Sequence, residues 1–347
     1  MRRARLLAAL SAPATGVVAY CAAVREQTWP TMRLPISPST NAFGDVEGVF
    51  NYQAADVTHV FTRRDGGGSD ATLHGAQWDA HQVVVRNGRQ QPGITFDKSG
   101  FALHSDPKEV HVDYYDEQSV ICTYYSECEE LLRCVTGARY VRAFDHNVRS
   151  EAGQKSGKRL HGGNLVQGPA GIVHGDYTAA SAPRRLRLLS EAPKMNDPLR
   201  PVLGDTPLVP PAVADDALLH GRRFAFINIW RPISTVLTNP LACCDASTVS
   251  ADDLLVFEIH YADRIGENYF AKYSPSHGWH YFPKMTRDEV LLLKQWDSCG
   301  DLVAGASAVR EAAPPSTFSL HSAFLDPSSP PGAPDRESIE VRLVAIY

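Results

Sequence analysis

The sequence of 347 residues lacks the patterns that mark several common classes of protein. No run of about 20 uninterrupted apolar residues occurs, which excludes a polytopic membrane protein. No face rich in lysine or arginine is evident and the formal net charge is −5, so we do not expect a nucleic-acid-binding surface. No internal repeat is visible, so nothing in the chain indicates a repeat architecture.

Cysteine and nucleotide-binding patterns are missing as well. The seven cysteines are scattered and include no CxxC pair, so we expect neither a disulfide framework nor a thiolate zinc site, but reduced thiols in a cytoplasmic protein. The glycines of "RRDGGGSD" (63–70) lack the lysine–serine pair of a phosphate-binding loop. No GxSxG motif occurs, so the nucleophile turn of an α/β-hydrolase is not expected.

The composition that is present is that of an ordinary globular protein. Apolar residues make up 44% of the chain and charged residues 21%, which argues against general disorder. We expect a single domain over residues 46–347. Residues 1–45 begin with arginines and an apolar run, with no acidic residue before Glu26. This pattern fits a mitochondrial or secretory targeting segment, and equally a disordered extension.

Two segments have the apolar spacing of helices. Residues 116–138 carry apolar side chains at helical spacing, followed by Gly137, a residue type that commonly ends a helix. Residues 179–192 predict a second helix. Around residues 190–222 we expect an insertion or a lid loop, because the stretch 196–217 is proline-rich and without periodicity.

Short β-like segments dominate the rest of the chain. They are rich in β-branched and aromatic residues and are separated by turn residues, which predicts an antiparallel sandwich or barrel. The expected fold class is therefore mainly β with helices (α+β). Its core would be a double-stranded β-helix of the jelly-roll or cupin-like type, with helices from the N-terminal half as support. The clearest predicted strands lie within 139–150, 223–233, 252–261, 279–284, 288–298, 316–324 and 338–347.

The segment "GIVHGDYTAAS" (171–181) contains a His-x-Asp pair. Side chains alternate along a strand, so His174 and Asp176 are expected on one face, where both can bind one metal ion. A third ligand must come from elsewhere in the fold, and His321, in a β-like run near the C-terminus, is the first candidate. Two histidines and one carboxylate leave three positions of an octahedral Fe(II) open for a co-substrate and O₂.

A second pair of polar residues opens the last predicted strand. Arg336 and Ser338 are two residues apart and therefore share a strand face. Because a guanidinium pairs bidentately with a carboxylate, Arg336 is the candidate to bind a dicarboxylate co-substrate, with Ser338 as an additional hydrogen-bond donor. The order His-x-Asp, distant His, Arg-x-Ser is the order that an Fe(II)- and 2-oxoglutarate-dependent oxygenase needs.

Two further histidines compete with His321 for the third ligand position. His277 and His280 flank Trp279 in an aromatic-rich segment. Such a segment can place one histidine at the mouth of the site, so each is also a candidate pocket residue or a residue that contacts a ligand. A position at the edge of a strand, without any role in the site, is left open for both.

Three more residues are candidates for the pocket or its surroundings. Arg231 follows an apolar segment, so we expect it to be buried and to pair with Asp245 or with the co-substrate. His146 lies in a polar cluster at the end of a predicted strand, and Tyr177 follows the predicted metal ligand directly. A purely structural role is left open for each of them.

Longer stretches of the chain resemble a known family. They include "VRNGR", "TGARYVRAFDHNVR", "VHGDYT", "FINIWRPI", "PLACCDA", "WHYFPKMTRDEVLLLKQWDS", "HSAFLDP" and "RESIEVR". Through them, roughly residues 47–347 resemble the hydroxylase/desaturase family that includes fungal gibberellin desaturase, a cephalosporin 7α-methoxylase component and a meroterpenoid endoperoxygenase. The first 45 residues and the stretch around 190–222 depart from the usual layout of that family.

The resemblance implies an Fe(II)- and 2-oxoglutarate-dependent oxygenase of specialised metabolism, with His174, Asp176 and His321 on the iron and Arg336 on the co-substrate. Such an enzyme would hydroxylate or desaturate a small apolar metabolite and release succinate and CO₂. The alternatives are a jelly-roll metalloenzyme with Zn or Mn and non-redox chemistry, and a catalytically inactive binding module. A homodimer is left open, and neither a nucleic acid nor a membrane is expected as a partner.

Overall fold

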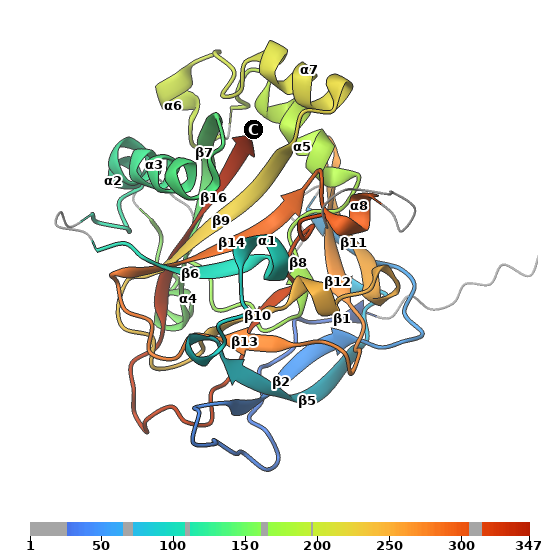
Figure 1. Cartoon of the computed structure of the whole chain (residues 1–347), viewed down its shortest axis with the longest axis vertical. Helices are drawn as coiled ribbons and strands as arrows, with labels where there is room; N and C mark the ends of the chain where they lie inside the picture. Colours follow the sequence, from blue (N-terminus) through green and yellow to red (C-terminus); the bar gives the residue numbers. More distant parts are fainter. Residues whose placement is uncertain (1–25, 65–71, 108–111, 161–165, 196, 305–313) are drawn as a thin grey trace, which may run out of the picture.

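Two β-sheets with helices at their margins make up the protein, as shown by a computed structural model (Figure 1). The structure describes residues 26–64, 72–107, 112–160, 166–195, 197–304 and 314–347. The expected class, mainly β with helices around a jelly-roll core, is confirmed. The two sheets share one hydrophobic core, and the predicted site residues lie where the sheets meet.

The larger sheet has eleven strands in the order β1-β4-β3-β11-β12-β8-β15-β10-β13-β5-β2. Strands far apart in sequence are neighbours in it, because β8 pairs with both β12 and β15. Its strands are β1 (Glu26–Gln27), β2 (Val46–Gln53), β3 (Val60–Arg64), β4 (Leu73–His74), β5 (Trp78–Asn87), β8 (His174–Gly175), β10 (Leu241–Cys244), β11 (Leu254–Tyr261), β12 (Ile265–Ala271), β13 (Trp279–Tyr281) and β15 (His321–Ala323).

The smaller sheet has five antiparallel strands in the order β6-β14-β9-β16-β7. Strands β9 and β14 are buried along almost their whole length, which explains why both read as near-continuous apolar runs. Its strands are β6 (Phe101–Ser105), β7 (Tyr140–Ser150), β9 (Phe224–Pro232), β14 (Glu289–Asp297) and β16 (Glu337–Ile346).

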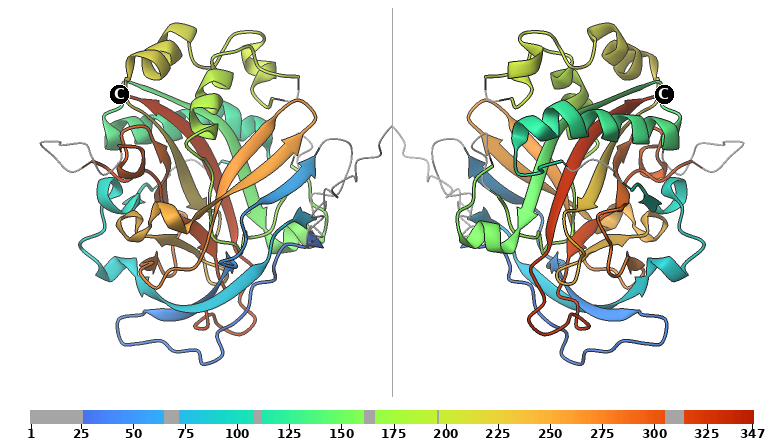
Figure 2. Two further views of the ribbon diagram at one scale, coloured as in Figure 1. Left: turned by 90° about the vertical axis from the view of Figure 1, so that its right-hand side faces the viewer. Right: turned by 90° about the vertical axis from the view of Figure 1, so that its left-hand side faces the viewer.

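Helix α3 covers the outer face of the smaller sheet, against β7 and β16 (Figure 2). It ends where the sequence predicts, since Gly137 has a φ of 68° and so adopts the left-handed conformation that glycine favours. The α-helices are α1 (Phe96–Ser99), α2 (Glu117–Ser119), α3 (Tyr125–Thr136), α4 (Glu151–Lys155), α5 (Ser181–Leu189), α6 (Arg200–Leu203), α7 (Pro211–His220) and α8 (Asp301–Ala304). A π-helical turn (Val120–Tyr124) joins α2 to α3, and three 3₁₀ turns cover Gly88–Gln90, Ala246–Thr248 and Ala251–Asp253.

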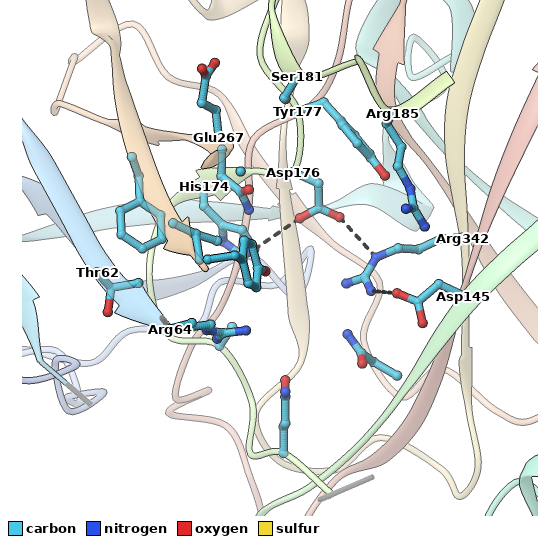
Figure 3. Close-up of a pocket in the computed structure, with 18 of the residues that line it drawn as sticks. Thr62, Arg64, Asp145, His174, Asp176, Tyr177, Ser181, Arg185, Glu267 and Arg342 are labelled. Atoms are coloured by element: carbon cyan, nitrogen blue, oxygen red, sulfur yellow. Dashed lines mark hydrogen bonds and ion pairs between the residues drawn. The ribbon is translucent and has the colours of Figure 1, made fainter. Parts of the chain in front are cut away.

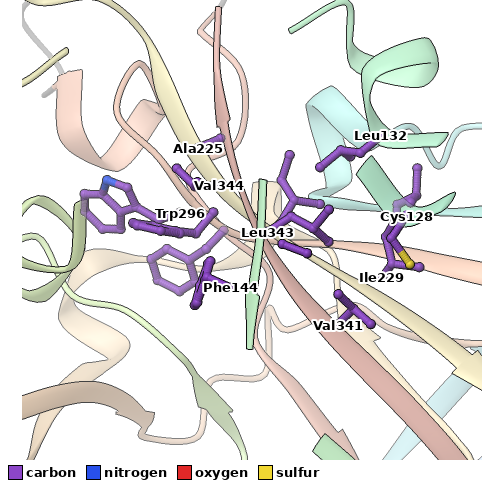
Figure 4. Close-up of a cluster of buried hydrophobic side chains, with 14 of the residues drawn as sticks. Cys128, Leu132, Phe144, Ala225, Ile229, Trp296, Val341, Leu343 and Val344 are labelled. Atoms are coloured by element: carbon purple, nitrogen blue, oxygen red, sulfur yellow. The ribbon is translucent and has the colours of Figure 1, made fainter. Parts of the chain in front are cut away.

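The smaller sheet packs apolar side chains on both of its faces (Figure 4). Leu343 of β16 and Leu132 of α3 belong to the face that the helix covers, and both are fully buried. Trp296 and Val344 lie on the opposite face, in the same continuous core. A sheet buried on both faces holds its strands in a fixed register, and the polar site residues depend on that register.

Two expectations about chain organisation are modified by the structure. Residues 196–217 are not a loop throughout, since α7 begins at Pro211, where the fixed φ of proline favours a helix start. Residues 1–25 lie outside the described residues, and within 26–45 Trp29 contacts the domain, placed edge-on against Phe257 at 6.1 Å between ring centroids. Within the described part of the chain, no helix has the length and apolar character needed to cross a membrane.

The core packing predicts a large effect of shortening one side chain. Leu343→Ala should lower the free energy of unfolding by about 2–5 kcal/mol, because it leaves a cavity between the small sheet and α3. Leu219→Ala is the matched control, since Leu219 is 68% exposed on α7 and its loss should change the value by about 0.5 kcal/mol or less. Urea denaturation measures both, and equal effects would contradict the packing described.

Candidate metal centre

The two histidines of the predicted site are direct cross-strand neighbours. His174 opens the short strand β8, and the antiparallel register of β8 and β15 pairs it with His321. Their ring centroids lie 4.2 Å apart. A slip of one residue in either strand would turn one imidazole to the opposite face of the sheet. His174 and His321 are 147 positions apart in the sequence, and the pairing of β8 with β15 places these two candidate ligands side by side.

Asp176 completes the cluster from the residue that follows β8. Its Oδ1 lies 3.7 Å from His174 Nε2 and 4.0 Å from His321 Nε2. Among the described residues, these three form a group whose ligand atoms all lie within 4.8 Å of one another. Gly175 faces the other way, where an added Cβ would stand 3.3 Å from the ring of Phe318. The expectation that the His-x-Asp side chains share one face is therefore confirmed.

The smaller sheet holds the carboxylate of Asp176. Asn228 of β9 donates a hydrogen bond to Oδ2 at 3.0 Å, and Arg342 Nε of β16 lies 3.7 Å from the same oxygen. Asn228 and Arg342 are themselves cross-strand partners, and Arg342 donates to Asp145 on the next strand at 2.8 Å. Gln295, at a register shift in β14, accepts a hydrogen bond from the Asp176 amide at 3.2 Å. One row of polar residues across the sheet thus positions this ligand.

The protonation states of the three residues suit a divalent metal. Nδ1 of His174 lies 3.0 Å from the Ile172 carbonyl oxygen, and Nδ1 of His321 lies 3.3 Å from that of Ser319. A carbonyl only accepts, so each Nδ1 carries the proton and each Nε2 offers its lone pair towards Asp176. The donor set and its tautomers therefore fit a metal ion held by two imidazoles and one carboxylate.

The pKa values of the cluster favour the metal-binding forms at neutral pH. Burial and the neighbouring His321 lower the pKa of His174 to about 4, and burial also lowers the pKa of His321. Burial opposes ionisation of Asp176, but the charges of Arg342 and the two imidazoles outweigh it and lower its pKa to about 2. Neutral imidazoles and an ionised carboxylate are the forms that bind metals.

A small cavity of about 20 Å³ connects the three residues with Arg336. The guanidinium of Arg336 donates to the Asn239 carbonyl oxygen at 2.6 Å and lies 5.5 Å from the centroid of the Trp230 ring. Arg336 Nε and the Ser338 hydroxyl are buried and have no hydrogen-bond partner within the described structure. Burial and the charge of Arg149 lower the pKa of Arg336 to about 9. A buried cation without an acidic partner is a site for a small anion.

A second, much larger cavity of about 1050 Å³ opens on the other side of the cluster (Figure 3). His174, Asp176 and Arg342 line it, together with Tyr177, whose ring stacks on Phe226 at 4.5 Å between centroids. The structure thus places Tyr177 in the pocket, as the sequence predicts. His174 and Asp176 line both cavities, whereas His321 lines only the small one.

Two of the other predicted pocket residues lie elsewhere. His146 faces away from the cavity, because its neighbours Asp145 and Asn147 line it and side chains alternate along β7. Its Nδ1 is 2.9 Å from the hydroxyl of Tyr125 on α3. Arg231 is buried as expected, but its partner is Asp106, with which it forms an ion pair, and not Asp245 or a co-substrate.

The rival histidines lie away from the cluster. His280 is on β13, and β10 separates that strand from β15, so His280 is two strands from His321. His277 is engaged by the Tyr52 hydroxyl and by the carboxylate of Asp253, each at 3.2 Å. Neither belongs to the group of close ligand atoms in the described structure.

Sequence reasoning missed the residues that hold Asp176. Asn228 and Gln295 interrupt the apolar runs "FAFINIW" and "EVLLLKQWD". A single polar residue inside a buried strand must find a polar partner, and this signal points to a site. Arg342 is a similar interruption in the last strand. The sequence could have identified these positions as unusual, but not which side chain they contact.

The chain is similar in sequence to known proteins. Residues 50–201 and 206–346 match the model of the oxidoreductase/YMDC permease-like domain. The chain is 29% identical to the hydroxylase/desaturase efuI of Hormonema carpetanum, over 81% of this chain and 90% of that protein. It is 29% identical to the Fe(II)/2-oxoglutarate-dependent dioxygenase nvfI of Aspergillus novofumigatus, over 76% of this chain and 83% of that protein.

The chain is also similar to a bacterial protein and to a solved structure. An uncharacterized protein in the dcmA 3' region of Methylophilus leisingeri is 34% identical, over 50% of this chain and 81% of that protein. The structure of the iron and alpha-ketoglutarate-dependent endoperoxidase NvfI superposes with a TM-score of 0.64 at 24% identity, covering 87% of this chain and 98% of that one. The resemblance expected from the sequence is confirmed, and so is the fold.

The cluster predicts which histidines bind metal. His174→Ala and His321→Ala should each weaken binding of Fe(II) or Co(II) by more than about 100-fold, since loss of a ligand exceeds the 10- to 100-fold effect of losing an outer contact. His280→Ala is the matched control and should leave the affinity unchanged. Calorimetric titration under anaerobic conditions measures all three. Loss of affinity in His280→Ala with retention in His321→Ala would reverse the assignment of the third ligand.

Metal affinity should also depend on pH in a specific window. A proton competes with the metal only below the pKa of the free ligand, and burial lowers the pKa values of His174 and His321 from their usual range. Affinity should therefore be constant between about pH 8 and pH 6 and fall as the pH approaches about 4. If the metal affinity instead began to fall at about pH 6.5, the usual pKa of a histidine, burial would not be lowering these pKa values.

Proposed function

Because the chain belongs to the oxidoreductase/YMDC permease-like domain family, we propose that it is an Fe(II)- and 2-oxoglutarate-dependent oxygenase that hydroxylates or desaturates a small molecule. The single observation that carries this proposal is the group of His174, Asp176 and His321 on the same small cavity as the buried Arg336, which forms no ion pair in the described structure. Relatives that carry the names of such oxygenases support it.

The metal would be held by His174, Asp176 and His321. When bound, Fe(II) with 2-oxoglutarate and O₂ supplies an oxidant that removes hydrogen from a C–H bond of the substrate, with release of succinate and CO₂. The contribution of the protein is to keep both imidazoles neutral and to hold the carboxylate ionised through Arg342 and Asn228.

Arg336 and Ser338 would bind the far carboxylate of 2-oxoglutarate. The free Arg336 Nε and the Ser338 hydroxyl are unused donors in a buried environment, and a carboxylate would satisfy both. The small cavity has room for roughly one water molecule, so a co-substrate that reaches Arg336 has to displace side chains. Leu241 and Trp230 are two of the side chains that line this cavity.

The alternatives considered from the sequence gain no support. A catalytically inactive binding module would lack a ligand or the co-substrate arginine, but all of these residues are present and close together. The two fungal relatives carry the names of a hydroxylase/desaturase and of a dioxygenase. A cytoplasmic location is part of the proposal, since Cys122 and Cys134 are free and exposed and would stay reduced there.

The activity test uses co-substrate turnover, because it needs no knowledge of the substrate. Full-length protein with Fe(II), ascorbate and 2-oxoglutarate should form succinate slowly in air, and His174→Ala should not. Absence of succinate above the level without protein, in a preparation that binds iron, would refute the proposal.

Arg336 can be tested through the affinity for the co-substrate. Arg336→Met should raise the Kd for 2-oxoglutarate about 100-fold, in line with the loss of a charged hydrogen-bonded pair, without changing the affinity for the metal. Ser338→Ala should raise it about fivefold, as for one neutral hydrogen bond. Arg86→Met is the control, because Arg86 is exposed on β5 and lines neither cavity. An equal effect in Arg86→Met would exclude a specific role for Arg336.

A further inference from the structure

The large cavity is positively charged although the chain as a whole is negative. Eight arginine or lysine side chains and five aspartate or glutamate side chains line it, whereas the formal net charge of the protein is −5. A cavity whose lining carries more charges of one sign than of the other attracts ligands of the opposite charge. The wall of the cavity therefore favours a ligand with negative charge.

Most of the cations in this wall are already neutralised by acidic partners. Arg184 pairs with Glu267 at 3.3 Å, and Arg187 pairs with Asp215 at 2.6 Å. Arg342 is held by Asp145 and Asp176. These residues stabilise the wall itself and are not available to a ligand without breaking an ion pair.

Arg185 of α5 is different, since it has no acidic partner within the part of the chain that the structure describes. Its guanidinium lies 4.8 Å from the centroid of the Phe144 ring, and it lines the large cavity but not the small one. Arg149 also has no ion pair there, but it donates to the Gly168 carbonyl oxygen at 2.9 Å and lines both cavities. Arg185 is thus a cation that lines only the large cavity and that has no acidic partner in the described structure.

The hydroxyl of Tyr177 provides a neutral donor next to Arg185. Figure 3 draws the hydroxyl end of Tyr177 near the guanidinium of Arg185, to the right of Asp176, and the two groups interact electrostatically. Stacking on Phe226 fixes the Tyr177 ring. No hydrogen bond of its hydroxyl is present among the described residues, so a donor and a cation converge on the same space without a protein acceptor.

Another part of the cavity wall is apolar. Phe257 and Ile259 of β11 and Phe270 of β12 line it, and the two phenylalanine rings stack at 4.4 Å between centroids. These side chains come from the larger sheet, whereas Arg185 and Tyr177 come from α5 and the turn before it. A ligand that fills the cavity therefore meets apolar contacts and a cation at different places.

We propose that the large cavity binds an amphipathic acid, with an apolar body against Phe257 and Phe270 and one carboxylate bound by Arg185 and the Tyr177 hydroxyl. That this acid is the molecule oxidised at the metal rests on the proposed function. The anion site lies beside Asp176, so Arg185 sets which part of the substrate faces the metal. Arg185 is then a residue that determines specificity.

Two fluorescent probes distinguish the contribution of the negative charge to binding from that of the apolar body. Both 8-anilino-1-naphthalenesulfonate and N-phenyl-1-naphthylamine carry the same aromatic body, and only the first carries a negative charge. Full-length protein should bind the anionic probe at least tenfold more tightly than the neutral one. Decanoate should displace the anionic probe and 1-decanol should not, because only decanoate offers a carboxylate to Arg185.

Variants locate the effect at Arg185. Arg185→Gln should weaken binding of the anionic probe about tenfold or more and leave binding of the neutral probe unchanged, which also shows that the cavity is intact. Arg185→Lys should restore part of the affinity. Arg184→Gln, on the same helix, is the matched control and should have little effect, because Arg184 is already paired with Glu267. Equal losses in both glutamine variants, or no preference for the anionic probe, would overturn the proposal.

The same experiment distinguishes this proposal from the proposed function. It is carried out on metal-free protein and on protein with Mn(II) and 2-oxoglutarate, and the preference for the anionic probe should be present in both. If the protein forms succinate but shows no such preference, the anion site is wrong and the oxygenase assignment stands. If the preference is present and no metal or succinate formation is found, the anion site stands and the oxygenase assignment is wrong.

Discussion

The carboxylate of Asp176 is the point at which the two sheets of this protein meet. It follows a strand of the larger sheet, and its oxygens are held by Asn228 and Arg342 of the smaller one. A buried carboxylate needs such partners, because leaving it unpaired away from water costs several kcal/mol. The contact therefore sets the separation of the sheets at the place where His174 and His321 are already paired.

Burial of polar groups explains most of the remaining site. Every polar residue in the row from Asn228 through Arg342 to Asp145 has a partner within it or in Asp176. Arg336 Nε and the Ser338 hydroxyl, like Asn228 Oδ1 and Gln295 Nε2, are buried polar atoms without a partner in the described structure. The anionic co-substrate that we propose would give Arg336 and Ser338 a partner. Arg185 differs, since it is only partly buried and lines the large cavity.

Much of the fold could be predicted from the sequence, because burial leaves a clear pattern. Long apolar runs identified β9 and β14, and alternation identified β7. Strand β10, with four residues, could not be recognised in this way, and β8, with two, was expected only because of its His-x-Asp pair. Such short strands exist only because longer neighbours supply their hydrogen bonds. The helix α7 was missed because its proline-rich start resembles a loop.

By itself, the sequence determined the residue types of the site and their order along the chain: His174 and Asp176 on one strand face, then a distant histidine, then Arg336. It left His277 and His280 as rivals of His321, because spacing in sequence says nothing about which strands become neighbours. Only the tertiary structure decided that β15 and not β13 lies beside β8. It also decided that Asp145 and not His146 faces the cavity. The physical reason is that strand pairing and register are fixed by packing over the whole sheet, and no local pattern contains them.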